Sequence, residues 1–496
     1  MKSQDITSNT PKSTPSSQKN TELNLWQALI PVFALVAMLF YNVFYVFGDD
    51  ALSGSNQFIL ILGAAVAALV GFYNKVSYKK MLEEVAENVK STTGALLILL
   101  MVGSLAGTWL ISGVIPSMIY YGLQILNPTF FLVASVIICS IISIATGSSW
   151  TTSATVGIAL IGIGNTLGIS AGMTAGAVLS GAYFGDKMSP LSDTTNLAPA
   201  MAGSDLFDHI KYMAYTTVPT IIITLIIFLI IGLNLETNGT PDISDKLQAI
   251  DGAFNISPWL FSVPIVVIAL IVKKTPPLIA LLIGTLLGAI AAIIAQPQIV
   301  MAIAESNVLD FKSAYKGVMK AITVDTAVET TSIELNDLFT AGGMYGMLKT
   351  IWLIICAMIF GGVMDAIGAL SRISKALLSL ATTTFGLFAS TVASCLALNV
   401  TASDQYLALV VPGKMFKKAY KDRDLAPENL SRTLEDSGTV TSVLVPWNTC
   451  GAYQSGVLGV SVADYFVFAF FNWISPFMTL LFAAFSIKIK QLKKSN

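Results

Sequence analysis

The chain has 496 residues, of which 54% are hydrophobic and only 11% are charged, and its formal net charge is −1. Soluble domains carry about 25% charged residues, so the composition excludes an ordinary soluble domain. The near-neutral charge offers no basic surface for nucleic acid. The four cysteines stand singly in apolar stretches and there is one histidine, so neither a disulfide framework nor a zinc-type metal site is indicated.

The N-terminal residues 1–24 are mostly polar and rich in Ser, Thr and Pro. They lack the apolar core of a signal peptide, so we predict a disordered cytoplasmic tail that stays in the protein.

Long apolar runs occupy most of the remaining chain. A helix crosses a bilayer with about 20 apolar residues, and these runs are continuously apolar, whereas the strands of a membrane β-barrel alternate. We therefore predict an all-α polytopic membrane protein. Its ten expected spans lie near residues 25–47, 57–73, 93–113, 170–200, 216–235, 257–272, 276–296, 344–368, 431–452 and 461–486.

The loop charges predict the orientation of these spans. Lysines and arginines gather in the tail, in residues 74–90 and in residues 413–432, whereas residues 236–256 are acidic. Because positive loops stay in the cytoplasm, both termini are expected there, in a multi-pass protein of the cytoplasmic membrane. The alternation holds if residues 129–168 and 385–412 each enter and leave on one side, although their arms are also compatible with full crossings.

A weak internal sequence similarity divides the ten predicted spans into two groups of five. When the chain is shifted by 255 residues, Asp193 meets Asn448 and Thr194 meets Thr449. An odd number of spans per half predicts inverted repeats, 25–235 and 257–486, as in many secondary transporters. Each half would hold a re-entrant hairpin, about 129–168 and about 385–412, and a helix broken near Pro190 or Pro446.

The polar interruptions of both halves offer hard oxygen ligands, which suit Na⁺ better than a soft transition metal. The Na⁺ candidates are Thr146, Ser149, Asp193, Thr194, Asn399, Thr401, Asn448 and Thr449. A carboxylate in low dielectric is costly to keep charged unless a cation compensates it, so one group can hold either H⁺ or Na⁺. The proton-coupling candidates are Asp186, Asp193, Asp404 and Asp436.

Each acid also has a structural interpretation. Asp186 could form an ion pair with its neighbour Lys187, Asp404 could cap a helix, and Glu435 and Asp436 could be water-exposed caps. Asp193 has the weakest structural explanation, because the proline break and the repeat place it in the centre of the motif.

Three strings carry a family resemblance: GDKMSPLSDTTNLAPA (185–200), NVTASDQYLALVVPGKMF (399–416) and LAPENLSRTLEDSGTVTSVLVPWNTCGAY (425–453). On these residues the chain resembles the NhaC family of sodium/proton antiporters. The resemblance implies a scaffold, two re-entrant hairpins, a moving transport domain and Na⁺-dependent exchange. Some members of that family resemble malate/lactate exchangers, and others move amino acids.

The function that follows is secondary active exchange of Na⁺ for H⁺ by alternating access, with Na⁺, H⁺ and membrane lipid as partners and no cofactor. A homodimer is compatible with such a scaffold. The alternative is a Na⁺/H⁺-coupled exchanger of organic anions (malate, lactate) or amino acids. We find no Lys or Arg deep in a predicted span, which favours a cation as cargo. An enzyme is not expected, because the residues before Asp186 do not match the G-x-G-D sequence of aspartyl membrane proteases and no P-loop occurs.

Overall fold

A computed structural model describes residues 23–47, 54–125, 127–235, 243–273, 275–336 and 339–492. The predicted disordered tail, residues 1–24, lies outside the described residues except for its last two positions.

The described chain is a polytopic helical protein, as the composition predicts. Within it, eight helices are long and apolar enough to cross a membrane, and a pair of helices bent by 82° would make a ninth. The straight ones are α1 with the π-helical turn η1 (Leu25–Tyr41, Asn42–Phe47), α2 (Ser55–Tyr73), α4 (Thr93–Ile111), α6 (Pro128–Thr146), α11 (Leu206–Asn234), α14 (Pro277–Ala295), α18 with α19 (Gly343–Gly346, Leu348–Ala366) and α21 (Thr384–Thr401). The bent pair consists of α12 (Ile243–Ala253) and η4 with α13 (Pro258–Phe261, Ser262–Val272).

Three of the ten predicted spans are interrupted. Residues 170–200 form α9 (Ala171–Met188) and α10 (Asp193–Ala202), separated by a short non-helical stretch that contains Pro190. Residues 431–452 are divided among α23 (Pro427–Leu434), the π-helical turn η5 (Glu435–Thr439), the 3₁₀ turn η6 (Ser442–Leu444) and α24 (Thr449–Leu458), with Pro446 in the last gap. Proline lacks the N–H that a continuous helix needs, which explains why the helices stop near Pro190 and Pro446.

The third interrupted span is 461–486, where α25 (Val462–Phe466) precedes the shorter apolar helix α26 (Phe470–Ala484). Conversely, the first arms of both predicted hairpins are the full-length helices α6 and α21.

The remaining elements are short helices or lie outside the candidate spans. They are α3 (Tyr78–Ser91), α5 (Val114–Ile125), α7 (Ser149–Thr152), η3 (Ser153–Gly157), α8 (Ile158–Thr166), α15 (Pro297–Ala304), α16 (Phe311–Thr323), α17 (Ile333–Asn336), α20 (Ala369–Ser379) and α22 (Gln405–Lys421), with the antiparallel pair β1 (Thr326–Ala327) and β2 (Thr340–Ala341).

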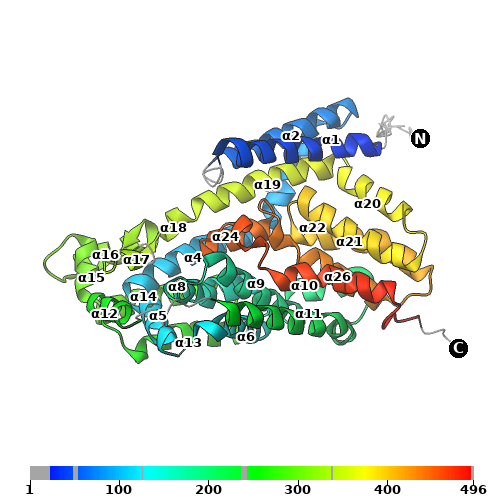
Figure 1. The fold of residues 1–496 in the computed structure, drawn as a ribbon. Helices are drawn as coiled ribbons and strands as arrows, with labels where there is room; N and C mark the ends of the chain where they lie inside the picture. Colours follow the sequence, from blue (N-terminus) through cyan, green and yellow to red (C-terminus); the bar gives the residue numbers. More distant parts are fainter. Residues whose placement is uncertain are drawn as a thin grey trace, which may run out of the picture.

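The long helices share one general direction, which separates the molecule into two ends (Figure 1). α12, α15, α16 and α17 gather at one end, whereas the start of α1, α20 and the end of α26 lie at the other. The described part of the acidic loop, in α12, therefore lies at the opposite end of the molecule from the start of α1 and the end of α26.

The helices α6 and α9 pack extensively against each other. A Cβ added at Gly181 of α9 would lie 2.3 Å from the carbonyl oxygen of Val136 in α6, so the two backbones approach as closely as glycine allows. Ser143 Oγ donates to the carbonyl oxygen of Ala182 at 2.6 Å and joins the same two helices. This rigid contact positions the end of α9.

Elements in the two halves have matching bounds. α4 and α19 are 19 residues each and begin 255 positions apart, at Thr93 and Leu348. Each is followed by a glycine with positive φ, Gly113 at +79° and Gly368 at +78°. α10 and α24 are 10 residues each, and each is capped at its start by a side chain, Ser192 or Asn448.

Candidate ion-binding site

A cavity of about 440 Å³ lies where the breaks of both halves meet. It is lined by the starts of α4, α22 and α24, the α6–α7 and α9–α10 turns, and the loop before α14. Three acids contribute to the lining: Asp186, Asp193 and Asp404. No Lys, Arg or His occurs among the described lining residues, so the described wall is acidic.

Asp186 lies in the last turn of α9, lines the cavity and is 9% exposed. Its Oδ2 accepts from both the backbone N and the Oγ of Ser149, at 3.1 and 2.7 Å. Ser149 begins α7 directly after the turn at Gly147, so the break in one segment supplies donors to the acid of the other. Two donors on one oxygen favour the charged carboxylate, whereas burial disfavours it.

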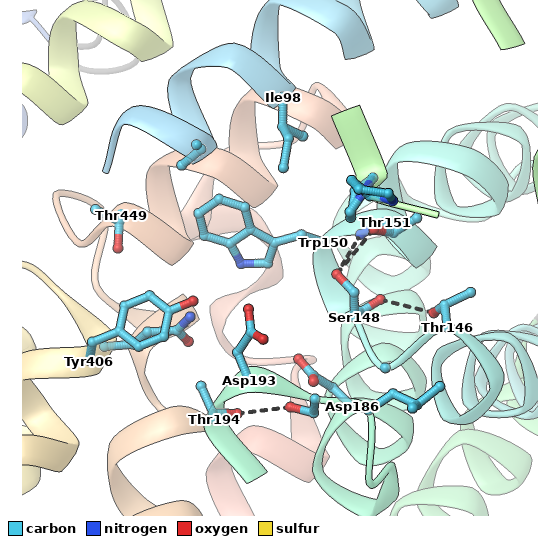
Figure 2. A pocket seen from close by; sticks show the side chains of 18 of the residues that line it. Ile98, Thr146, Ser148, Trp150, Thr151, Asp186, Asp193, Thr194, Tyr406 and Thr449 are labelled. Atoms are coloured by element: carbon cyan, nitrogen blue, oxygen red, sulfur yellow. Dashed lines mark hydrogen bonds between the residues drawn. The ribbon is translucent and has the colours of Figure 1, made fainter. Parts of the chain in front are cut away.

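Asp193 lies in the first turn of α10, lines the same cavity and is exposed. Figure 2 shows its carboxylate and that of Asp186 pointing into one space beneath the ring of Trp150, with Tyr406 facing them from the other side. Thr194 adds a hydroxyl, which lies 3.2 Å from Ser192 Oγ.

Asp404 is the N-cap of α22, and its Oδ1 accepts from the backbone N of Leu407 at 3.0 Å. The predicted capping role is therefore confirmed. The same residue lines the cavity.

The second-half candidates divide into two groups. Thr449 lines the cavity with Thr146 of the first half. Asn399 and Asn448 are fully buried and bond each other instead, because Asn448 Nδ2 donates to the backbone O and the Oδ1 of Asn399 at 3.1 and 3.2 Å. Thr401 Oγ1 donates to the carbonyl oxygen of Ala397 at 2.8 Å, within its own helix. The bonds between Asn399 and Asn448 therefore join the end of α21 to the start of α24.

Asp436 lies away from the cavity, in a fully buried ion pair with Lys187. Its Oδ2 also accepts from Thr216 Oγ1 at 2.9 Å and from Thr479 Oγ1. Two expectations are wrong here: Lys187 binds Asp436 rather than Asp186, and Glu435 and Asp436 are buried rather than water-exposed.

Two basic side chains that the sequence analysis did not predict to be buried are buried in the structure. Lys187 and Arg432 are both 0% exposed, so the expectation that no Lys or Arg lies deep in the predicted spans is wrong. Arg432 stacks over the Tyr212 ring at 4.5 Å, and its three guanidinium nitrogens have no hydrogen-bond partner in the described structure. The sequence did indicate an ion pair for Lys187, because a Lys beside an Asp in an apolar stretch is unusual. It pointed to the neighbouring Asp186, whereas the partner is Asp436.

Two aromatic side chains, Trp150 and Tyr406, also line the cavity. The Trp150 ring stacks on Tyr453 with ring centroids 4.0 Å apart, and Tyr453 Oη donates to the backbone O of Trp150 at 3.3 Å. Sequence reasoning did not select these residues, because an aromatic side chain in an apolar segment gives no local signal of a cavity.

Gly147 is required where the α6–α7 break meets the α9–α10 break. Its φ is +69°, and an added Cβ would lie 2.6 Å from Leu191 Cβ. We expect Gly147→Ala to lower the free energy of unfolding by about 2–4 kcal/mol, since a left-handed backbone and overpacking both oppose it. Chemical unfolding in detergent measures this, with Gly94→Ala, where the added Cβ meets nothing within 4 Å, as the control. Equal stability of the two variants would contradict the close approach.

Comparison with known proteins connects this geometry to a family. A family model described as the Na⁺/H⁺ antiporter family matches residues 181–487. The Na⁺/H⁺ antiporter NhaC of Alkalihalophilus pseudofirmus is 38% identical over 87% of this chain and 90% of its own length. The chain belongs to the Na⁺/H⁺ antiporter family. The predicted resemblance is thus confirmed.

Relatives named for other cargoes are nearly as similar. The malate-2H⁺/Na⁺-lactate antiporter of Bacillus subtilis is 37% identical over 87% of this chain and 88% of its own. The arginine/ornithine antiporter ArcD of Halobacterium salinarum is 31% identical over 92% of this chain and 90% of its own. In all of these relatives the match includes most of both chains.

Proposed function

We propose that this chain exchanges Na⁺ for H⁺ across a membrane and that the acidic cavity is its cation site. The observation that carries the proposal is the meeting of Asp186, Asp193 and Asp404 in one cavity whose described wall holds no basic side chain. Membership of the Na⁺/H⁺ antiporter family supports the same exchange. No cofactor takes part, and Na⁺ is cargo.

Asp186 is the group that we propose Na⁺ and H⁺ share. A buried carboxylate is costly to leave charged and unpaired, so it binds either a proton or a cation, and binding of one displaces the other. Asp193, Thr194, Thr146 and Thr449 supply further oxygens around the same space.

The α9 end also connects the cavity to the buried ion pair. Asp186 lies at the cavity and Lys187, the next residue, binds Asp436. We propose that the Lys187–Asp436 pair holds this end of α9 in register, so that Asp436 acts on the site through Lys187 rather than as a ligand.

Alternating access through two inverted repeats, 25–235 and 257–486, remains our proposal for the movement. The matched bounds of α4 and α19 and of α10 and α24 support it. The breaks at 147–148 and 402–404 are the points where the hairpins would turn, although α6 and α21 are each long enough to cross. Figure 1 places the start of α1 and the end of α26 at the same end, which supports two termini on one side of the membrane, and the positive loops favour the cytoplasm as that side.

A second cargo is favoured by the size and wall of the cavity. A volume of about 440 Å³ exceeds what one Na⁺ needs, and Trp150 and Tyr406 add aromatic faces that attract organic cations. A cationic amino acid, the kind of cargo for which the ArcD relative is named, is therefore the alternative that the acidic wall supports best. The malate/lactate alternative receives less support, because the described wall offers no cation for a carboxylate.

The test uses everted membrane vesicles with a preformed pH gradient that is acid inside. Added NaCl is expected to dissipate the gradient within the assay, because each Na⁺ that enters displaces protons. Arginine, ornithine, malate and lactate are added as chloride or sodium-free salts in parallel vesicles. A gradient that persists with NaCl but collapses with one of these compounds would refute Na⁺/H⁺ exchange and identify the alternative.

A further inference from the structure

A second cavity, of about 380 Å³, lies between the start of α11 and the C-terminal segment that follows α26. Its lining residues are Asp208, Lys211, Tyr212, Tyr215, Lys488, Ile489 and Lys490. Three lysines against one aspartate make the described wall positive, in contrast to the acidic ion cavity.

The C-terminal segment that carries two of these lysines is built into the fold. The carbonyl oxygen of Lys490 accepts from the backbone N of Ala426 at 2.9 Å and from Asn429 Nδ2 at 2.7 Å. Tyr212 Oη donates to the carbonyl oxygen of Lys488, which itself takes a left-handed φ of +49°. A backbone conformation of this kind persists when its surroundings enforce it, so the lysines are held at defined positions.

Two of the three cavity lysines, Lys211 and Lys488, are available to bind an anion. Lys490 Nζ donates to Glu428 at 2.6 Å, and this carboxylate raises the pKa of Lys490. Lys488 Nζ lies 5.1 Å from the centre of the Tyr215 ring, and within the described chain neither Lys488 nor Lys211 forms an ion pair. Behind the Tyr212 ring, the buried guanidinium of Arg432 adds positive potential.

Lys211 also heads an apolar stripe that leaves the cavity along the exposed face of α11. At helical spacing it is followed by Tyr215, Val218, Ile222 and Ile226, which are 46, 43, 50 and 50% exposed. α11 has 29 residues, about 44 Å at 1.5 Å per residue, whereas a hydrocarbon core is about 30 Å thick. Since Asp208 and Lys211 are charged and lie in the first two turns of α11, we place those turns at the level of the lipid headgroups.

We propose that this cavity binds an anionic phospholipid, with the phosphate between Lys211 and Lys488 and an acyl chain along the α11 stripe. Basic pockets beside membrane helices bind acidic headgroups in this way. The tyrosines suit the interface, where aromatic rings with one polar end gather. The stripe runs on from the lysines along a surface that suits an acyl chain, and a free phosphate has no such chain, so we commit to the lipid.

The test measures lipid retention by the purified full chain in detergent. Equal amounts of phosphatidylglycerol and phosphatidylcholine are added, and native mass spectrometry counts the lipids that stay bound. We expect preferential retention of phosphatidylglycerol, and a loss of this preference by about 30-fold in Lys211→Gln/Lys488→Gln, since each interfacial lysine contributes about fivefold. The matched control is Lys418→Gln/Lys421→Gln, which removes two exposed lysines from α22 and should keep the preference.

Two results would overturn the proposal. One is equal retention of phosphatidylglycerol by the double variant and by its control. The other is displacement of the lipid by inorganic phosphate at matched concentration, which would identify an anion site without a lipid. Thermal unfolding of each variant confirms that it is folded, so a loss of retention reports on the cavity itself.

Discussion

Asp186→Asn is expected to lose Na⁺-dependent proton exchange while the protein still inserts and folds. Asparagine keeps the shape and can still accept from Ser149 through Oδ1, so the α7 contact survives. The negative charge that would compensate Na⁺ is gone. We expect the exchange rate in everted vesicles to fall at least about 100-fold, since removing one partner of a buried charge pair costs ~3 kcal/mol or more.

Two further variants give this result its meaning. Asp422→Asn removes an exposed carboxylate at the end of α22 and should leave exchange unchanged. Asp193→Asn should weaken exchange less than Asp186→Asn, because the Asp193 side chain is exposed and solvent screens its charge. Full exchange by Asp186→Asn together with its loss in Asp193→Asn would move the shared carboxylate to Asp193.

Lys187→Met is expected to destabilise the protein by about 3–5 kcal/mol, because it leaves the Asp436 carboxylate buried without its cation. Lys187→Met/Asp436→Leu should recover most of that loss, since a buried ion pair replaced by apolar groups is often neutral. Chemical unfolding in detergent measures both variants, and exchange in vesicles shows whether the recovered protein still transports. If the pair positions Asp186, the double variant is stable but slow.

The control for this experiment is an exposed pair on the surface. Lys79 lies 3.9 Å from Glu83 on α3, and both side chains are mostly exposed. Lys79→Met should change the free energy of unfolding by less than about 1 kcal/mol, as exposed ion pairs contribute little. If Lys187→Met were as stable as Lys79→Met, the Lys187–Asp436 contact would not be the buried pair described here.

Much of the candidate site could be found in the sequence because its signals are local. Pro190 and Pro446 each stop a helix, and the hydroxyl and carboxyl groups next to them cannot lie against lipid. Asp186, Asp193, Thr194 and Thr449 were selected near these prolines, and Thr146 and Asp404 at the turns of the predicted hairpins. All six line one cavity. The capping of α22 by Asp404 was likewise legible, because an Asp three residues before a helical N–H is a local pattern.

The partners of the buried charged residues could not be predicted from the sequence in the same way. Lys187 and Asp436 are 249 positions apart, and the sequence offered the neighbouring Asp186 instead. Successive residues at the end of a helix point in different directions, so Asp186 and Lys187 reach different surroundings. Asn399 and Asn448 were selected correctly as polar groups in the breaks, yet they bond each other.

The class of protein, the places where its helices break and the family to which it belongs could all be read from the amino-acid order, because they depend on apolar length, proline and cap chemistry, and contiguous motifs. The packing of the helices was needed to show which acids share a cavity, which basic groups are buried and which surface of α11 meets a positive pocket. These features depend on contacts between helices that are hundreds of residues apart in the chain, and a short stretch of sequence does not show which distant helix it will contact.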